Sequence, residues 1–216
     1  MSMQPRSREL RADYEAAGVA AHYAAGRWTR SGHARRTHRK EQRIVRSMLA
    51  EAAAAAPLGA VLDVPCGAGR FQPLLAGTGA WVVGADVARP MVAEAGARSG
   101  APLLQASADA LPLPDGSFDL VFCFRLLHHF PRTEERRAVM AELGRVARRW
   151  ALVSYFDAAS FQAWRHRVRR RRTVRFAQSH ADFEAEAAAG GFRVRRRAWV
   201  ARGISEQVLA LLERAG

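Results

Sequence analysis

One segment, Val61–Arg70, constrains the fold of this chain more than any other. It reads Val-Leu-Asp-Val-Pro-Cys-Gly-Ala-Gly-Arg, so a short apolar run ends in Asp63, small residues follow, and a helix is expected to start at Phe71. Glycines let a backbone approach a ligand without a Cβ in the way, and a helix N-terminus offers free N–H groups to a carboxylate or phosphate. The segment predicts a strand, a glycine loop and a helix that bind a nucleotide-like cofactor.

Two segments further along the chain extend this pattern. The apolar run Trp81–Ala85 ends in Asp86, which suits a second parallel strand whose terminal acid binds ribose hydroxyls. A carboxylate suits a vicinal diol because both of its oxygens accept hydrogen bonds. The third segment, Leu103–Pro112, leads into the sequence Asp-Gly-Ser-Phe-Asp-Leu-Val. Pro65 stands where a dinucleotide-binding loop has its first glycine, so the chain does not match that fingerprint.

Four motifs occur in order: Leu-Asp-Val-x-Cys-Gly-x-Gly-Arg, Gly-x-Asp, Ala-Ser-Ala-x-x-Leu-Pro and Asp-Gly-Ser-Phe-Asp-Leu-Val. With these motifs in this order, the chain resembles class I S-adenosylmethionine-dependent methyltransferases. It is most similar to the small-molecule branch that includes the ubiquinone and menaquinone C-methyltransferases. The resemblance covers residues 58–156 well and the flanks loosely. It specifies the cofactor and the fold, but not the methyl acceptor.

The resemblance implies an α/β, Rossmann-like, doubly wound fold. Its sheet would have seven strands, mostly parallel, with a C-terminal antiparallel hairpin and an N-terminal helical cap. We expect the cap to span residues 1–56 and the cofactor-binding core to span residues 57–216. The alternation of strand and helix from residue 60 also predicts a parallel sheet with right-handed crossovers.

The expected strands are Ala60–Val64, Trp81–Ala85, Pro102–Gln105, Phe118–Phe124, Trp150–Tyr155, Phe192–Val200 and Glu206–Leu212. The last of these depends on the resemblance, because its composition suits a helix equally well. The expected helices are Ser7–Ala25, Thr37–Ala56, Phe71–Ala76, Pro90–Ser99, Thr133–Val146 and Ser179–Ala189. Ser179 and Asp182 have the spacing of a capping box.

The cofactor implied is S-adenosyl-L-methionine, which leaves as S-adenosyl-L-homocysteine. By resemblance, its methionine portion meets Asp63 and the backbone of Cys66, Gly67, Ala68 and Gly69, although Pro65 departs from the family's usual glycine. Its ribose would meet Asp86, and Val87 would flank the adenine.

The adenine contacts are expected from the third segment. Ser107 would accept a hydrogen bond from the adenine amine, and the backbone N–H of Ala108 would meet a ring nitrogen. Asp109 is expected either to contact the cofactor or to face the solvent.

Candidate catalytic residues follow the fourth strand. Active sites in open α/β sheets lie at the C-terminal ends of strands, so Arg125 is expected near the sulfonium or the substrate. His128 and His129 are adjacent, so at most one of them is expected to face the pocket, and His129 is favoured because it lies nearer the turn. A histidine there could deprotonate a hydroxyl or amine acceptor, although a purely structural histidine pair is the alternative.

Candidate substrate contacts come from the N-terminus. In similar methyltransferases an N-terminal helical segment closes over the cofactor, and its aromatic residues line the mouth of the site. The residues that would do so here are Tyr14, Tyr23, Arg27 and Trp28, which could instead only dock the helix. A solvated basic face, or a grip on a substrate anion, is predicted for Arg35, Arg36, His38, Arg39 and Lys40.

The net charge of +14 comes almost entirely from arginine, because Lys40 is the only lysine among 216 residues. Seven arginines lie between Arg165 and Arg175. They indicate either a genomic bias toward arginine or an anionic partner: nucleic acid, an acidic membrane surface or an acidic substrate. The two cysteines, the absence of a leader and the lack of an apolar run of about 18 residues favour a cytoplasmic protein without a transmembrane helix. Cysteine and histidine spacings suit no metal site.

We therefore expect a methyltransferase that acts on O or N of a small, amphiphilic or lipid-like molecule. One alternative is an RNA methyltransferase that uses the arginine-rich segment, although few exposed aromatics are expected there to stack bases. The other is a non-catalytic cofactor-binding scaffold, because Pro65 and the segment Ala147–Trp150 replace turns usual in the family. Peripheral contact with an acidic membrane is a further expectation.

Overall fold

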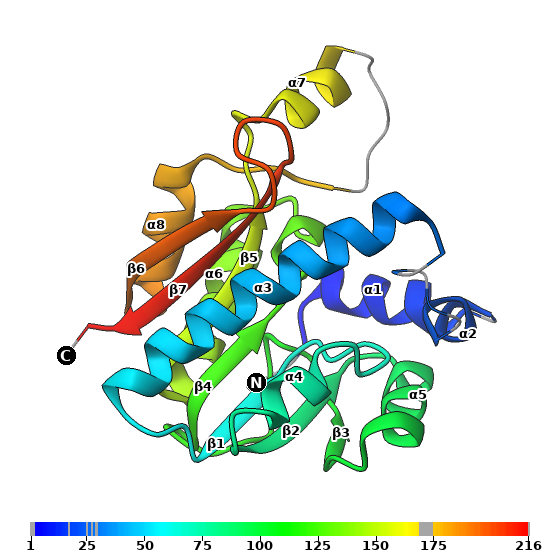
Figure 1. Ribbon diagram of the computed structural model, residues 1–216, viewed down its shortest axis with the longest axis vertical. Helices are drawn as coiled ribbons and strands as arrows, with labels where there is room; N and C mark the ends of the chain where they lie inside the picture. Colours follow the sequence, from blue (N-terminus) through cyan, green and yellow to red (C-terminus); the bar gives the residue numbers. More distant parts are fainter. Residues whose placement is uncertain are drawn as a thin grey trace.

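The computed structural model describes residues 3–16, 18–24, 26, 28, 30–168 and 175–215. Within them, seven strands form one sheet in the order β3-β2-β1-β4-β5-β7-β6 (Figure 1). The strands are β1 (Ala60–Asp63), β2 (Trp81–Asp86), β3 (Leu103–Gln105), β4 (Phe118–Cys123), β5 (Ala147–Phe156), β6 (Phe192–Trp199) and β7 (Gln207–Arg214). The first five pair in parallel, and β7 runs antiparallel to both β5 and β6. The predicted mostly parallel sheet with a C-terminal antiparallel hairpin is confirmed.

Helices cover both faces of this sheet. They are α1 (Pro5–Glu15), α2 (Val19–Ala24), α3 (Gly32–Ala55), α4 (Gln72–Ala76), α5 (Arg89–Ser99), α6 (Thr133–Val146), α7 (Phe161–Val168) and α8 (His180–Ala189), with a 3₁₀ turn η1 (Leu127–His129). Successive strand residues serve opposite faces: Val61 and Leu120 pack with α3, whereas Leu62 and Val121 pack with α6 and α8. Because both faces are buried, the strands read as continuous apolar runs.

The predicted N-terminal helix Ser7–Ala25 was wrong in its continuity. The structure has two helices, α1 and α2, with Gly18 between them at a φ of 82°. That left-handed conformation costs glycine little and other residues more, so the chain changes direction there. Helices α1 and α2 both contact α5, which brings them over the carboxyl ends of β2 and β3 (Figure 1).

Most other boundaries agree with the prediction to within two residues, but two differ by more. Helix α3 begins at Gly32 instead of Thr37, because the Ser31 side chain caps it by accepting a hydrogen bond from the Ala34 N–H over 3.1 Å. Strand β5 begins at Ala147 instead of Trp150, directly after α6 ends. The first change places the predicted basic face on the first turns of a long helix that packs against the sheet.

The capping box at the start of α8 is confirmed. Ser179 Oγ accepts from the Asp182 N–H over 3.0 Å, while the Asp182 carboxylate accepts from the Ser179 N–H over 3.4 Å. The other end of α8 lies against α6 at a contact between two glycines. A Cβ on Gly144 would lie 1.9 Å from the Gly190 carbonyl oxygen, so the two backbones touch where no side chain fits.

Candidate active site

A cavity of about 450 Å³ opens at the carboxyl ends of β1, β2 and β4. This is the edge where parallel sheets hold their ligands. The N-terminal helices and the loops after the strands supply its walls. Its lining includes Leu10, Tyr14, Tyr23, Trp28, His38, Asp63, Pro65, Cys66, Gly67, Ala68, Arg70, Phe71, Asp86, Val87, Met91, Phe122, Phe124, Arg125, Leu126, His128, His129 and Arg175.

The loop after β1 is fastened to β2. The Cys66 N–H donates to the Ala85 carbonyl over 2.8 Å, and the Gly67 N–H donates to Asp86 Oδ2 over 2.9 Å. Gly69 has a φ of 75° and lies so close to α5 that a Cβ would come within 3.3 Å of the Ala95 Cα. The glycines therefore serve a left-handed turn and a close helix contact, as the sequence pattern indicated. Gly69 itself is not among the residues that line the cavity.

Two buried carboxylates meet the cavity from neighbouring strand ends. Asp63 Oδ2 is buried without a hydrogen-bond partner, and burial, followed by the nearby Asp86 charge, raises the pKa of Asp63 well above its usual value. Asp86 accepts from the Gly67 and Ala88 N–H groups, each over 2.9 Å. Burial raises the pKa of Asp86 to about 6, although those backbone donors pull it down.

S-adenosylmethionine fits this set of groups. The unpartnered oxygen of Asp63 suits an ammonium, because a buried carboxylate is stabilised by a cationic donor. Each Asp86 oxygen accepts one backbone N–H and keeps a lone pair for a hydroxyl. A Cβ on Gly67 would meet no atom within 4 Å, so the backbone there is open to a ligand. Val87 also lines the cavity.

The third predicted segment does not reach the cavity. Ser107, Ala108 and Asp109 are buried but are not among its lining residues. Asp109 accepts from the Gln4 N–H and from Ser7 Oγ, each over 2.9 Å, and also from Ser107 Oγ. The expectation that Asp109 faces the solvent was wrong, because this carboxylate anchors the start of α1. The adenine contacts expected of Ser107 and Ala108, and the cofactor contact of Asp109, remain predictions.

Both histidines after β4 line the cavity, so the expectation that only one would face it was wrong. They lie in the 3₁₀ turn η1, where three residues complete a turn and neighbouring side chains do not alternate as in a strand. His128 stacks on Phe156 at 4.1 Å between ring centroids, and His129 Nε2 lies 3.4 Å from Tyr14 Oη.

Burial disfavours the protonated form of both imidazoles in the free protein. It lowers the pKa of His128 well below its usual value, with help from the neighbouring His129. Burial, followed by the charges of Arg6 and Arg175, lowers the pKa of His129 to about 4. Both rings are therefore neutral near pH 7, which is the protonation state that a general base requires.

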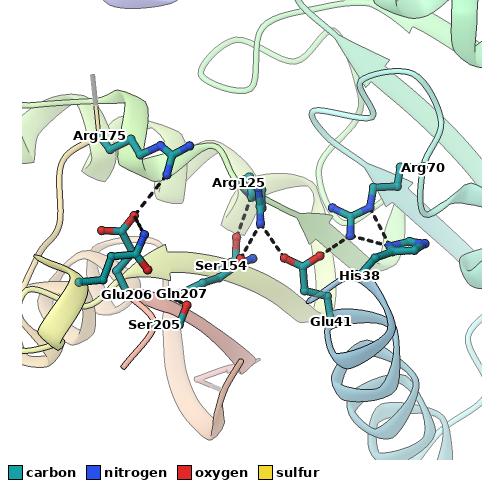
Figure 2. A network of polar contacts seen from close by, with 10 residues as sticks. His38, Glu41, Arg70, Arg125, Ser154, Arg175, Ser205, Glu206 and Gln207 are labelled. Atoms are coloured by element: carbon teal, nitrogen blue, oxygen red, sulfur yellow. Dashed lines mark hydrogen bonds and ion pairs between the residues drawn. The ribbon is translucent and has the colours of Figure 1, made fainter. Parts of the chain in front are cut away.

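Arg125 lies at the centre of a polar network (Figure 2). Its φ of 60° is unusual for a residue with a Cβ, and its N–H donates to Ser154 Oγ over 2.7 Å. Its guanidinium donates to Glu41 over 2.7 Å and to Gln207 over 2.8 Å. On its other side, Glu41 pairs with Arg70, which also contacts His38.

The predicted N-terminal aromatics come together in the wall of the cavity. The rings of Tyr14 and Tyr23 lie 5.9 Å apart between centroids, and those of Tyr23 and Trp28 lie 6.1 Å apart. All three line the cavity. Arg27, the fourth candidate, lies outside the described residues.

Sequence reasoning missed the site roles of Glu41, Arg70 and the phenylalanines of β4 and its end, Phe122 and Phe124. Glu41 is fully buried although arginines and a lysine surround it in sequence. An acid isolated in a basic helical segment was the available signal. Arg35, Arg36, Arg39 and Lys40 are exposed, and His38 alone of the predicted basic face lines the cavity.

Cys66 and Cys123 are free and buried, and burial raises the pKa of each thiol. In the described part of the chain, no three His, Cys, Asp or Glu side chains are placed to hold a metal ion. None of the described helices combines the length and the hydropathy needed to cross a membrane.

Known proteins share this sequence pattern and fold. The family described as "Methyltransferase domain" matches residues 62–153. Magnesium-protoporphyrin O-methyltransferase from Synechocystis is 33% identical over 100 residues, which are 44% of this chain and 43% of that protein. The matched segment thus spans less than half the length of that relative.

The fold extends this likeness to the whole chain. The crystal structure of magnesium protoporphyrin IX methyltransferase from Synechocystis PCC 6803 with bound S-adenosylhomocysteine has a TM-score of 0.76 at 20% identity, over 97% of this chain and 100% of that one. The structure of the same protein with S-adenosylmethionine gives 0.73 at 20% identity over the full length of both chains. The fold is that of the class I methyltransferases.

Proposed function

We propose that this protein transfers a methyl group from S-adenosylmethionine to O or N of a small or amphiphilic molecule, because residues 62–153 match the methyltransferase-domain family and the chain has the fold of class I methyltransferases. The observation that carries the proposal is the pair of buried carboxylates, Asp63 and Asp86, in one cavity beside a glycine loop. The proposal explains why two acids with raised pKa values are kept there, since binding groups are often perturbed in this way.

When bound, S-adenosylmethionine supplies an activated methyl group on a sulfonium. The chain's own residues bind the cofactor and the acceptor, orient them and exclude water. Asp86 would accept hydrogen bonds from the ribose hydroxyls of the cofactor, and Asp63 would accept one from its ammonium. The aromatic walls, Trp28 and Phe124 among them, keep water from the acceptor. His129 takes the proton of a hydroxyl or amine acceptor, since its imidazole is neutral near pH 7.

The acceptor we propose is a bulky, largely apolar molecule that carries an oxygen or nitrogen nucleophile. The cavity supports this proposal, because phenylalanine side chains and Trp28 supply much of its wall. The relative from Synechocystis is named for O-methylation of magnesium protoporphyrin. An acceptor of comparable bulk is a reasonable first choice, whereas membership of the ubiquinone and menaquinone branch and a cytoplasmic location stay predictions.

The test is calorimetric titration of S-adenosylmethionine and S-adenosylhomocysteine into the wild type and the Asp86→Ala variant. We expect micromolar binding to the wild type and a loss of at least about tenfold in the variant, because a charge-assisted hydrogen-bond pair is removed. The exposed Asp115→Ala change is the control. Absence of binding to the wild type would refute the proposal, and binding without turnover of any acceptor would favour the scaffold alternative.

A separate observation favours contact with an anionic lipid surface. Helix α7 exposes Phe161 (53%), Trp164 (53%) and Val168 (59%) at the spacing of one helix face, and Ile204 lies beside them at 67% exposed. Figure 1 shows α7 beyond the ends of β6 and β7. Exposed Arg165 supplies positive charge on the same helix. The expectation of few exposed aromatics near the arginines was wrong for this helix.

Lipid fits this face better than RNA does, because Val168 and Ile204 cannot stack on bases. We propose that α7 binds the surface of an acidic membrane, from which an amphiphilic acceptor would enter the cavity. Vesicles containing phosphatidylglycerol should sediment the wild type but not Trp164→Ser or Phe161→Ser, whereas pure phosphatidylcholine vesicles should not. Equal binding of wild type and variants to the acidic vesicles would refute the proposal, and variant-sensitive binding to single-stranded RNA alone would favour the RNA alternative.

A further inference from the structure

Two guanidinium groups in the cavity keep buried donors that have no partner. Nη1 of Arg70 and Nε of Arg125 are both buried, and neither has a hydrogen-bond acceptor. Both guanidinium groups lie over the ring of Trp28, with their Cζ atoms 4.1 and 4.6 Å from its centroid. Buried N–H groups of charged side chains are costly to leave unpaired, so the pair is built to meet an acceptor.

The charges around this pair do not balance. Glu41 is the carboxylate that contacts both arginines, so one negative charge faces two positive ones (Figure 2). Gln207 accepts from Arg125 but is neutral. Burial, followed by the charge of Arg70, lowers the pKa of His38, so this neighbouring ring is neutral near pH 7 and does not change the charge balance. An excess of positive charge on largely buried side chains favours an anionic ligand.

The rest of the cavity limits where that anion can lie. Asp63 and Asp86 would repel an anion placed beside them, and the Phe71, Phe122 and Phe124 side chains offer no hydrogen bonds. Guanidinium groups bind carboxylates and phosphates through charge-assisted hydrogen bonds. We propose that Arg70 and Arg125 form a subsite for an oxyanion, a carboxylate or a phosphate, carried by the methyl acceptor. This inference rests on the proposed function and narrows the acceptor to an apolar, preferably aromatic, acid.

The experiment measures binding of three matched probes to protein saturated with S-adenosylhomocysteine: 2-naphthoate, 2-naphthyl phosphate and the neutral 2-naphthamide. We expect the wild type to bind at least one of the two anions about tenfold tighter than the amide, the effect of one or two charge-assisted bonds. The carboxylate and phosphate arms identify which oxyanion the subsite prefers. This anion preference should disappear in Arg70→Gln and in Arg125→Gln.

Two controls keep the result interpretable. Arg193→Gln removes an exposed arginine that does not line the cavity and that pairs with Glu213 over 3.0 Å. This variant should keep the anion preference. If a glutamine variant fails to fold, Arg70→Lys and Arg125→Lys replace it in the experiment. They keep the charge and lose the planar guanidinium, so we expect them to lose part of the anion preference. Equal binding of anions and amide to the wild type, or a preference retained in both glutamine variants, would overturn the inference.

A carboxylate on the cofactor is the rival occupant. To separate it, each variant is also titrated with S-adenosylhomocysteine and with 5′-methylthioadenosine, which lacks the amino-acid portion. Loss of affinity for the former alone, with the naphthoate preference intact, would assign the arginines to the cofactor and overturn the inference. If the wild type binds no S-adenosylhomocysteine yet discriminates the naphthyl anions, then the proposed function fails and the oxyanion subsite stands.

Discussion

Arg125 and Glu41 lie 84 residues apart in the chain, and the guanidinium of Arg125 donates to Glu41 Oε1 over 2.7 Å. The second carboxylate oxygen of Glu41 pairs with Arg70. The Glu41 side chain is completely buried, whereas Arg70 and Arg125 keep 13% and 23% of their side-chain surface exposed. One acid in α3 thus holds together the loop after β1 and the end of β4.

Replacing this acid should destabilise the fold. Glu41→Gln leaves two neighbouring guanidinium groups without a counter-charge, and breaking a buried ion pair costs about 3 kcal/mol of unfolding free energy. Urea denaturation of both proteins measures the loss. The matched control is Glu51→Gln in the same helix, whose partly exposed pair with Arg196 should contribute less than about 1 kcal/mol. Similar losses in the two variants would contradict this account of Glu41.

Asp86 predicts a pH dependence of cofactor binding. Its pKa of about 6 means that the free protein holds this carboxyl protonated below that pH, when it accepts fewer hydrogen bonds from ribose. The affinity for S-adenosylhomocysteine should therefore rise as the pH increases through about 6. The step should be absent in Asp86→Asn, which binds more weakly, and present in His38→Gln. A step that persists in Asp86→Asn would assign it to another group.

The same shift acts on stability in the opposite direction. The pKa of Asp86 is higher in the folded protein than its usual value of 3.8, so between these two values the folded state binds more protons than the unfolded state. This carboxyl therefore stabilises the fold at low pH, and its contribution is lost as the pH rises from about 4 to about 6. Denaturation curves of the wild type and Asp86→Asn across that range measure the difference.

His129 should matter for turnover and not for cofactor affinity. With an acceptor that must lose a proton, His129→Gln should lower kcat by at least about tenfold and leave the Kd for S-adenosylhomocysteine unchanged within about twofold. Because the pKa of His129 is about 4, kcat at saturating substrates should be flat between about pH 6 and 8. Exposed His33→Gln is the control. A His129→Gln enzyme as fast as the wild type would assign the ring a structural role.

The contact between α6 and α8 predicts a severe effect from one methyl group. Gly144→Ala would place a Cβ 1.9 Å from the Gly190 carbonyl oxygen, and backbone cannot rotate away as a side chain can. We expect a loss of about 3 kcal/mol or more, at the upper end for overpacking. Gly96→Ala in α5, whose Cβ would lie 3.3 Å from a Leu103 methyl group, should change stability by less than about 1 kcal/mol. Tolerance of Gly144→Ala would show that the two helices can separate.

Local chemistry was enough to predict much of this protein. The apolar runs, the acids that end them and the glycine loop predicted the strands, the parallel sheet and the position of Asp63 and Asp86, because these depend on residues adjacent in the chain. The Ser179–Asp182 capping box followed for the same reason. The antiparallel last strand came only from the resemblance to a family, since its composition suits a helix equally well.

Only the tertiary structure decided which distant side chains share the cavity. Asp109 was expected at the cofactor or in solvent, yet it anchors Gln4 and Ser7 of the N-terminal segment. In the sequence, Glu41 is one polar residue among many in a helical segment, and only the fold shows that it pairs with two arginines. Sequence spacing determines the direction of a side chain within one strand or helix. Partners in a buried ion pair depend on how separate elements pack, and no local pattern encodes that.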